Sequence, residues 1–284
     1  MDNVLISAAG LAELIEAGRR PRLLDVRWRL GGPPGREEYR SGHIPGAVYV
    51  DLDEELAAPP GPGTGRHPLP DPVRLQAAAR SWGLRTGELV VAYDDAGNLS
   101  AARAWWLLRW AGVSKVRLLD GGLGAWRAAG LPVATGDAPV PGEKVPPGDI
   151  ELTAGLLPTV DPDGAAALVA AGGVLLDARA GERYRGEVRS IDPQPGHIPG
   201  AFSAPTTENL TSAGTFRAPA ELARRFAELG LRPGRAVGVY CGSGVTAAHE
   251  IAALAVAGFD DVVLYPGSWS QWATLPGRPV ETGA

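Results

Sequence analysis

The residues best suited to chemistry lie in the stretch "YCGSGVTAAHE", which contains Cys241, the only cysteine of the chain. Gly242, Ser243 and Gly244 follow it, and a helical pattern starts near Val245 or Thr246. Amide N–H groups at the start of a helix have no partner inside the helix, and together with the helix dipole they favour an anion. Thiols in such places ionise readily and act as nucleophiles near neutral pH. The stretch therefore predicts a reactive thiolate.

The residue types leave other roles for Cys241 to be weighed. A lone cysteine can be a small buried apolar residue, but the glycines and the helix start beside it favour reactivity. A tyrosine-phosphatase-type loop needs an arginine six residues after the cysteine, where this chain has Ala247. A cysteine–histidine hydrolase needs a base within reach. The chain offers four histidines: His43, His67, His197 and His249.

The segments that would position this loop occur twice in the chain. "LLDVRW" from Leu23 recurs as "LLDARA" from Leu175, and "GHIPGA" around His43 recurs around His197. "VVAYDDAGNLSAA" lines up with "VGVYCGSGVTAAH", and "VRLLDGGLGAW" with "VVLYPGSWSQW". Four matches in the same order indicate two homologous domains. Because one "GHIPG" histidine lies in the half without a cysteine, this pair argues against a cysteine–histidine hydrolase.

Within each half, short apolar runs alternate with helical patterns, which predicts a parallel sheet with helices on both faces. Residues 236–240 would form a strand that ends at Cys241, and ligands of such sheets bind at the carboxyl ends of strands. A Pro- and Gly-rich stretch predicts a linker at residues 137–149. We therefore expect one α/β domain at residues 1–136 and a second at 150–284.

The composition narrows the class of protein. A net charge of −5 over 284 residues gives no basic surface for nucleic acid. One cysteine excludes an intramolecular disulfide and a multi-cysteine zinc site. The N-terminal residues lack the basic and apolar regions of a signal peptide, and no apolar stretch is long enough to span a membrane. We expect a cytoplasmic protein that binds neither nucleic acid nor membranes.

These paired segments, with the cysteine loop in the second half only, resemble the rhodanese superfamily in its two-domain form. The loop "CGSGVTA" is similar to that of 3-mercaptopyruvate sulfurtransferases. Thiosulfate sulfurtransferases of this layout usually carry two basic residues after the cysteine, where this chain has Gly242 and Ser243. The resemblance implies two tandem rhodanese-like domains and a Cys241 persulfide. Its sulfur would come from 3-mercaptopyruvate, and possible acceptors are a thiol, such as that of a thioredoxin-like protein, or cyanide.

The resemblance also implies roles for individual residues. Asp94 stands where the second half has Cys241, so residues 1–136 should be catalytically silent. His43 and Arg183 are candidate substrate-binding residues, and Arg189 is the nearest candidate for a second substrate arginine. The aspartate that some relatives place before the first-domain histidine has no match, so Ser243 is expected to assist the sulfur. The persulfide would be stabilised by a group of loop residues: Gly242, Gly244, Val245 and Thr246.

No metal or organic cofactor is expected, because the proposed chemistry needs only a thiolate and a second thiol. Two other functions stay open at this point. One is a sulfurtransferase that prefers thiosulfate as donor. The other is a sulfur-carrier or regulatory rhodanese module with little turnover.

Overall fold

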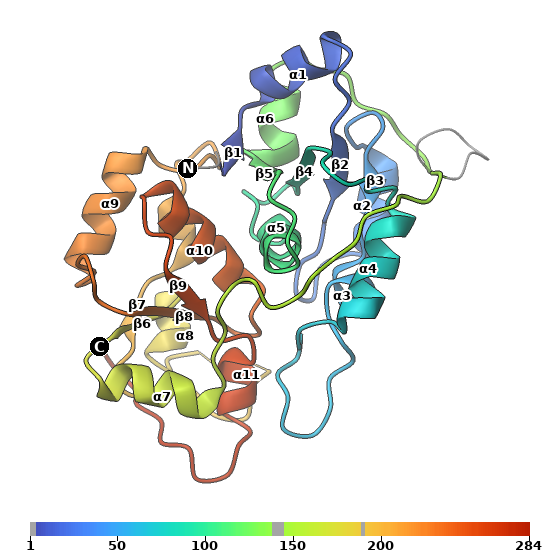
Figure 1. The fold of residues 1–284 in the computed structure, drawn as a ribbon. Coiled ribbons are helices and arrows are strands. Elements are labelled where there is room, and N and C mark those ends of the chain that lie inside the picture. Colours follow the sequence, from blue (N-terminus) through green and yellow to red (C-terminus); the bar gives the residue numbers. More distant parts are fainter. Residues whose placement is uncertain (1–3, 138–144, 189–190) are drawn as a thin grey trace. The chain divides into compact units, whose positions relative to one another are not determined.

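The computed structural model describes residues 4–137, 145–188 and 191–284 (Figure 1). The chain divides into two compact units. The first unit contains Met1–Ala58, Pro70–Leu156 and Thr211–Phe216, and the second contains Pro59–Leu69, Leu157–Leu210 and Arg217–Ala284. Each unit has its own parallel sheet and its own helices, as the alternating pattern predicts.

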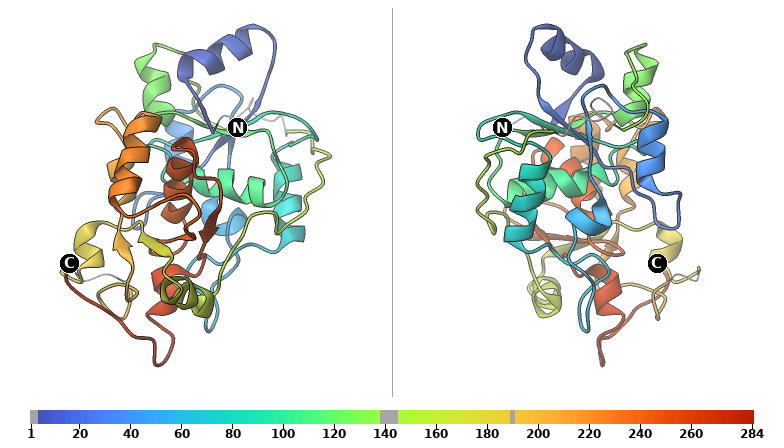
Figure 2. Two further views of the ribbon diagram at one scale, coloured as in Figure 1. Left: turned by 60° about the vertical axis from the view of Figure 1, so that its left-hand side comes forward. Right: turned by 90° about the vertical axis from the view of Figure 1, so that its right-hand side faces the viewer.

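The sheet of the first unit has the strand order β1-β5-β4-β2-β3, and all its pairs are parallel. Its strands are β1 (Leu5–Ile6), β2 (Arg22–Asp25), β3 (Val48–Tyr49), β4 (Val90–Tyr93) and β5 (Val116–Leu119). Its helices are α1 (Ala8–Glu16), α2 (Gly35–Ser41), α3 (Leu52–Glu55), α4 (Pro72–Ser81), α5 (Ala101–Trp110) and α6 (Gly122–Ala128). Helices α1 and α6 lie side by side (Figures 1 and 2).

The sheet of the second unit has the order β7-β6-β8-β9 and is again parallel. Its strands are β6 (Val174–Asp177), β7 (Phe202–Ser203), β8 (Val237–Tyr240) and β9 (Val262–Leu264). Its helices are α7 (Pro162–Ala170), α8 (Gly181–Tyr184), the 3₁₀ turn η1 (Thr206–Asn209), α9 (Pro219–Glu228), α10 (Thr246–Val256) and α11 (Ser268–Trp272).

The two central strand pairs have the same register, as the repeated sequence implies. Asp25 lies opposite Tyr93 in the first sheet, and Asp177 lies opposite Tyr240 in the second. The next residue after each tyrosine leaves the sheet at its carboxyl end. That residue is Asp94 in the first unit and Cys241 in the second.

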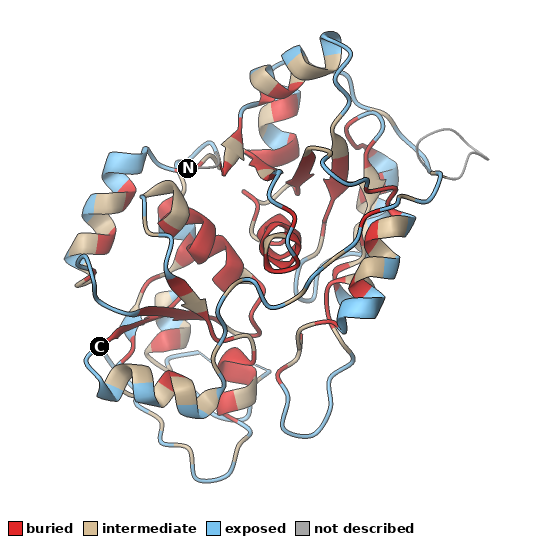
Figure 3. Ribbon diagram, viewed as in Figure 1, coloured by how far each residue is buried: buried red, intermediate tan, exposed pale blue. Residues whose placement is uncertain are grey.

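Burial explains why these strands read as continuous apolar runs. All residues of β4 and β8 are buried, and α5 and α10 are buried over most of their length (Figure 3). Trp105, Trp106 and Trp110 of α5 are core residues. The sheets thus hold the two loops that follow β4 and β8 on rigid supports.

Candidate active site around Cys241

The backbone of Cys241 is held where β8 ends. Its N–H donates to Ser268 Oγ at 3.1 Å, and its carbonyl accepts from Trp269 N at 3.0 Å. Ser268 in turn donates to the Tyr265 carbonyl, and it has a positive φ of 54°. The start of α11 therefore fixes the position of Cys241.

The sulfur lies beside the start of α10, as the sequence predicts. Gly244 N–H donates to Cys241 Sγ at 3.1 Å. Gly244 has φ +83°, and a Cβ there would lie 2.4 Å from the Pro266 carbonyl oxygen. Glycine is thus required both for the turn and for the close packing against Pro266.

Cys241 is 1% exposed, so its thiol is more enclosed than a freely accessible nucleophile would be. Its surroundings are nevertheless polar at the sulfur, because a main-chain N–H points at it. Ser243 is also buried, whereas Gly242 is half-buried. The sulfur is therefore buried within the loop, with the Gly244 amide directed at it.

The matching loop of the first unit binds an anion of its own. Asp94 Oδ1 accepts from the N–H groups of Ala96 and Asn98, both at 2.8 Å. Asp94 Oδ2 accepts from Ser100 N at 2.8 Å and Ala101 N at 3.1 Å. Four amides thus point at one carboxylate at the start of α5.

Burial raises the pKa of Asp94, and the four N–H groups oppose that rise by stabilising the charged form. A loop of this design can hold a negative group away from water. The loop around Cys241 follows the equivalent strand in the same register and ends at the equivalent helix, and there the Gly244 N–H donates to the sulfur.

Ser243, predicted to assist the sulfur, has a partner that the sequence did not reveal. His67 Nδ1 lies 2.7 Å from Ser243 Oγ, and both side chains are buried. A hydrogen bond of this length allows a proton to move between the hydroxyl and the imidazole. Ser243 directly precedes Gly244, whose N–H donates to the sulfur.

His67 lies beside Ser243 because residues 59–69 pack within the second unit, which also contains Cys241. Arg66 N–H donates to Ser270 Oγ at 3.0 Å, and Gln271 Nε2 donates to the Gly63 carbonyl at 2.7 Å. A Cβ on Gly65 would lie 2.4 Å from the Gly267 carbonyl oxygen. The segment is therefore bound closely along α11, next to the loop of Cys241.

The arginines after β6 have different surroundings. Arg179 is buried, donates to both oxygens of Asp177 and to the Gly196 carbonyl, and so has a structural role. Arg185 pairs with the exposed Glu187. Arg183, on α8, is half-buried, and within the described residues its guanidinium has no hydrogen-bond or ion-pair partner. Arg189, the second candidate, lies outside the described residues.

His43 and His197 are held in the same way. His43 Nδ1 lies 2.9 Å from the Tyr39 carbonyl, and its ring stacks on Tyr39 at 4.0 Å. His197 repeats this with Tyr184, at 2.9 Å and 3.7 Å. Both are buried and stabilise the turn of their "GHIPG" segment, and a substrate contact by His43 stays a prediction.

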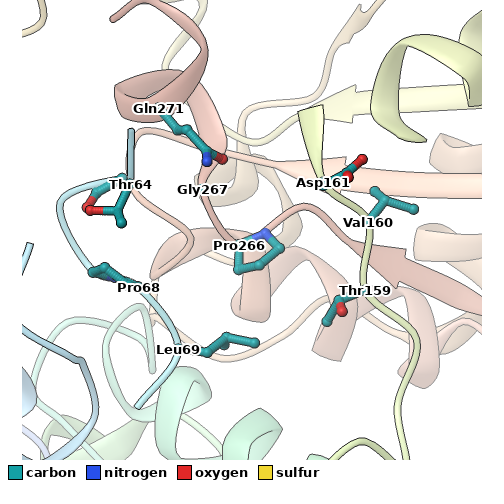
Figure 4. A pocket seen from close by; sticks show the side chains of 10 residues that line it. Thr64, Pro68, Leu69, Thr159, Val160, Asp161, Pro266, Gly267 and Gln271 are labelled. Atoms are coloured by element: carbon teal, nitrogen blue, oxygen red, sulfur yellow. The ribbon is translucent and has the colours of Figure 1, made fainter. Parts of the chain in front are cut away.

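A cavity of about 680 Å³ lies beside the segment that supports the loop (Figure 4). Pro266 and Gly267 line it, and these residues also contact Gly244 and Gly65. In Figure 4 Thr64, Pro68 and Leu69 lie across from Val160 and Asp161. The cavity therefore adjoins the candidate site on the side of Pro266.

In residues 4–137, 145–188 and 191–284, no group of three or more His, Cys, Asp or Glu side chains is placed to hold a metal ion. None of the helices in these ranges is long and apolar enough to span a membrane.

His67 and Arg66 are the residues that sequence reasoning missed. A usable signal existed, because His67 lies outside the repeated "GHIPGA" segments, and the spacing that aligns Tyr93 with Tyr240 places it opposite Gly214. A histidine outside the repeated segments is not explained by the repeat. His67 could have been set apart from His43 and His197 on that ground.

Comparisons with known proteins agree with the architecture. A family model described as Rhodanese-like domain matches residues 7–129 and 161–275. A protein of Mycobacterium tuberculosis named "Putative thiosulfate sulfurtransferase SseB" is 48% identical over 281 residues, covering 99% of this chain and 97% of that protein. A protein of Pseudomonas aeruginosa named "Probable 3-mercaptopyruvate sulfurtransferase" is 49% identical over 266 residues, 92% of each chain. The crystal structure of SseA from Escherichia coli superposes with a TM-score of 0.81 at 33% identity, covering 94% of this chain and 99% of that one.

Proposed function

Since this chain belongs to the rhodanese family and is a sulfurtransferase, we propose that Cys241 takes a sulfur atom from 3-mercaptopyruvate and carries it as a persulfide. The observation that carries this proposal is the N–H of Gly244, which points at the sulfur at the start of α10. A thiolate and a persulfide are both anions, and preorganised amides stabilise each of them.

In the first step the Cys241 thiolate attacks the sulfur of the donor. The new S–S bond forms as the donor's C–S bond breaks, and the electron pair of that bond moves onto carbon as the enolate of pyruvate. This enolate then takes up a proton and leaves as pyruvate. Arg183 supports the step, because its guanidinium, which has no partner among the residues that the structure describes, can bind the donor carboxylate in a bidentate way.

Ser243 and His67 form the proton-handling pair of the proposal. The thiol proton of the donor must leave and the enolate must gain one, so a group that both accepts and donates is needed. The imidazole of His67 can do both, through the hydroxyl that lies 2.7 Å from it. The short distance and the burial of both side chains support this role.

In the second step a thiol acceptor attacks the outer sulfur of the persulfide and Cys241 leaves as the thiolate. The cycle is therefore ping-pong, with the persulfide as the covalent intermediate. A small-molecule donor and an acceptor follow from the enzyme class. A thioredoxin-like protein or cyanide as acceptor, and a cytoplasmic location, are parts of the proposal that the sequence suggests.

The relatives' names point to two donors, 3-mercaptopyruvate and thiosulfate. We favour 3-mercaptopyruvate because the loop carries Gly242 and Ser243 in place of two basic residues. A keto acid also leaves Arg183 with a carboxylate to bind. In this proposal the Asp94 loop carries no sulfur, because a carboxylate cannot, and residues 1–136 take part only through the segment at 59–69, which contains His67.

Intact-mass measurement tests the proposal directly. The protein is treated with 3-mercaptopyruvate, freed of donor and weighed, and the mass should rise by one sulfur atom. Cys241→Ser should show no rise, and a thiol acceptor should return the wild-type mass to its starting value. An unchanged mass of the wild-type protein with both 3-mercaptopyruvate and thiosulfate would falsify the proposed function.

A further inference from the structure

Arg66 lies beside the Cys241 loop, although it comes from a distant part of the sequence. The end of its side chain lies close to Gly242, since a Cβ on that glycine would lie 3.3 Å from Arg66 Nη2. Its main chain is fixed by the bond to Ser270 Oγ. The guanidinium therefore lies in tight contact with position 242 of the Cys241 loop.

The guanidinium of Arg66 has an ion-pair partner at Nη1, and in the described part of the chain it has none at Nε or Nη2. Arg66 Nη1 pairs with Asp192, whose side chain is only 4% exposed. Arg66 Nε is buried without a hydrogen-bond partner, and within the described residues Nη2 has none either. Nε and Nη2 form one edge of the guanidinium, and this edge is suited to two parallel bonds with a carboxylate or sulfonate.

Asp192 strengthens this arrangement. Asp192 binds Nη1 and so fixes one end of the guanidinium, while the Nε–Nη2 edge keeps its donors for another partner. An anion on that edge would use donors that Asp192 does not use. Arg66 is 25% exposed, which leaves part of it open to a small ligand.

We propose that Arg66 is a specificity-determining residue, whose Nε–Nη2 edge binds the anionic group of the sulfur donor next to Cys241. The inference rests on the proposed function and deepens it. It gives the proposed site a second cation in addition to Arg183. It also places a positive charge over Gly242, where the loop has no basic residue. The ligand class is a small anionic sulfur donor, and the anion is a carboxylate or a thiosulfonate group.

The test compares donors that differ in charge. Persulfide formation on Cys241 is followed by intact mass in single turnovers, with 3-mercaptopyruvate, its uncharged methyl ester and thiosulfate. The variants are Arg66→Gln and Arg66→Lys. Arg278→Gln serves as the matched control, because Arg278 is 22% exposed and also pairs with an aspartate, Asp163.

Arg66→Gln should lower the second-order rate constant by about tenfold or more with at least one of the two anionic donors, the scale of a lost charge-assisted hydrogen bond. The donor affected identifies the bound anion. With the methyl ester, the rate constant of Arg66→Gln should differ from that of the wild type by less than about threefold, because the ester lacks the anionic group that Arg66 binds. Arg66→Lys should recover part of the loss through its charge, but not the bidentate contact. Arg278→Gln should match the wild type with every donor.

Two results would overturn the inference while leaving the sulfurtransferase proposal intact. One is wild-type rates of Arg66→Gln with both anionic donors. The other is an equal loss with the ester, which would mean that Arg66 only supports the loop. Should Arg66→Gln not fold, Arg66→Lys carries the same comparison, since it keeps a positive charge toward Asp192. If the wild-type protein gains no sulfur from any donor, the proposed function fails first.

Discussion

Gly244 offers the sharpest test of how the loop supports the sulfur, and we predict that Gly244→Ala damages both stability and reactivity. An alanine at φ +83° costs about 1–2 kcal/mol for the left-handed backbone alone. Its Cβ would also lie 2.4 Å from the Pro266 carbonyl oxygen, so the loop must shift. A shift moves the Gly244 N–H away from the sulfur.

The size of the chemical effect follows from that lost bond. A hydrogen bond to a charged group contributes about 1.5–3 kcal/mol, which corresponds to roughly 10- to 150-fold in rate. We expect persulfide formation from 3-mercaptopyruvate to fall by that factor. Alkylation of Cys241 by iodoacetamide should also be slower in the variant, because the thiolate loses a hydrogen-bond donor.

Gly258 is the matched control for this experiment. It follows the same helix, α10, has φ +92° and has no atom within 4 Å of a built Cβ. Gly258→Ala therefore carries the backbone cost without a clash and without touching the sulfur. We expect lower stability with unchanged persulfide formation. If Gly244→Ala reacts like the wild type in both assays, the amide does not stabilise the sulfur and our reasoning about the loop is wrong.

Four further predictions concern single side chains. His67→Ala should slow pyruvate release from 3-mercaptopyruvate by about 10²–10⁴-fold, the range of general acid–base catalysis, and an effect below threefold would remove it from the mechanism. Asp94→Asn should leave donor turnover within about fivefold of the wild type while lowering the melting temperature, since a paired buried carboxylate is lost. Arg183→Ala should cost about 2–4 kcal/mol in kcat/KM, and less than tenfold would contradict its assignment. Glu250 is fully buried, and burial raises its pKa to about 7. A carboxyl whose folded-state pKa is raised contributes stability that is full below about pH 4.5 and is lost as the pH rises through 7. The free energy of unfolding should therefore fall between these values in the wild type relative to Glu250→Gln, and parallel pH profiles of the two would refute this.

Much of the candidate site could be predicted from the sequence because its central part is local. The strand at 237–240, the glycine loop and the helix from Thr246 are adjacent in the chain, so periodicity and turn residues were sufficient to place Cys241 at a strand end. The repeat likewise placed Asp94 in the equivalent position, and the matching register of the two sheets agrees with it.

The tertiary structure alone decided which distant side chains meet this loop. His67 and Ser243 are 176 residues apart in the sequence. They meet because main-chain groups of residues 59–69 form hydrogen bonds with side chains of α11, and no local sequence pattern indicates such bonds. Arg179, Arg183 and Arg185 look alike in the sequence, and only their folded surroundings show that Arg179 and Arg185 are paired, whereas Arg183 has no partner in the described part of the chain. Local periodicity determines where elements begin and end, whereas the partners of a side chain depend on how loops without periodicity pack in three dimensions.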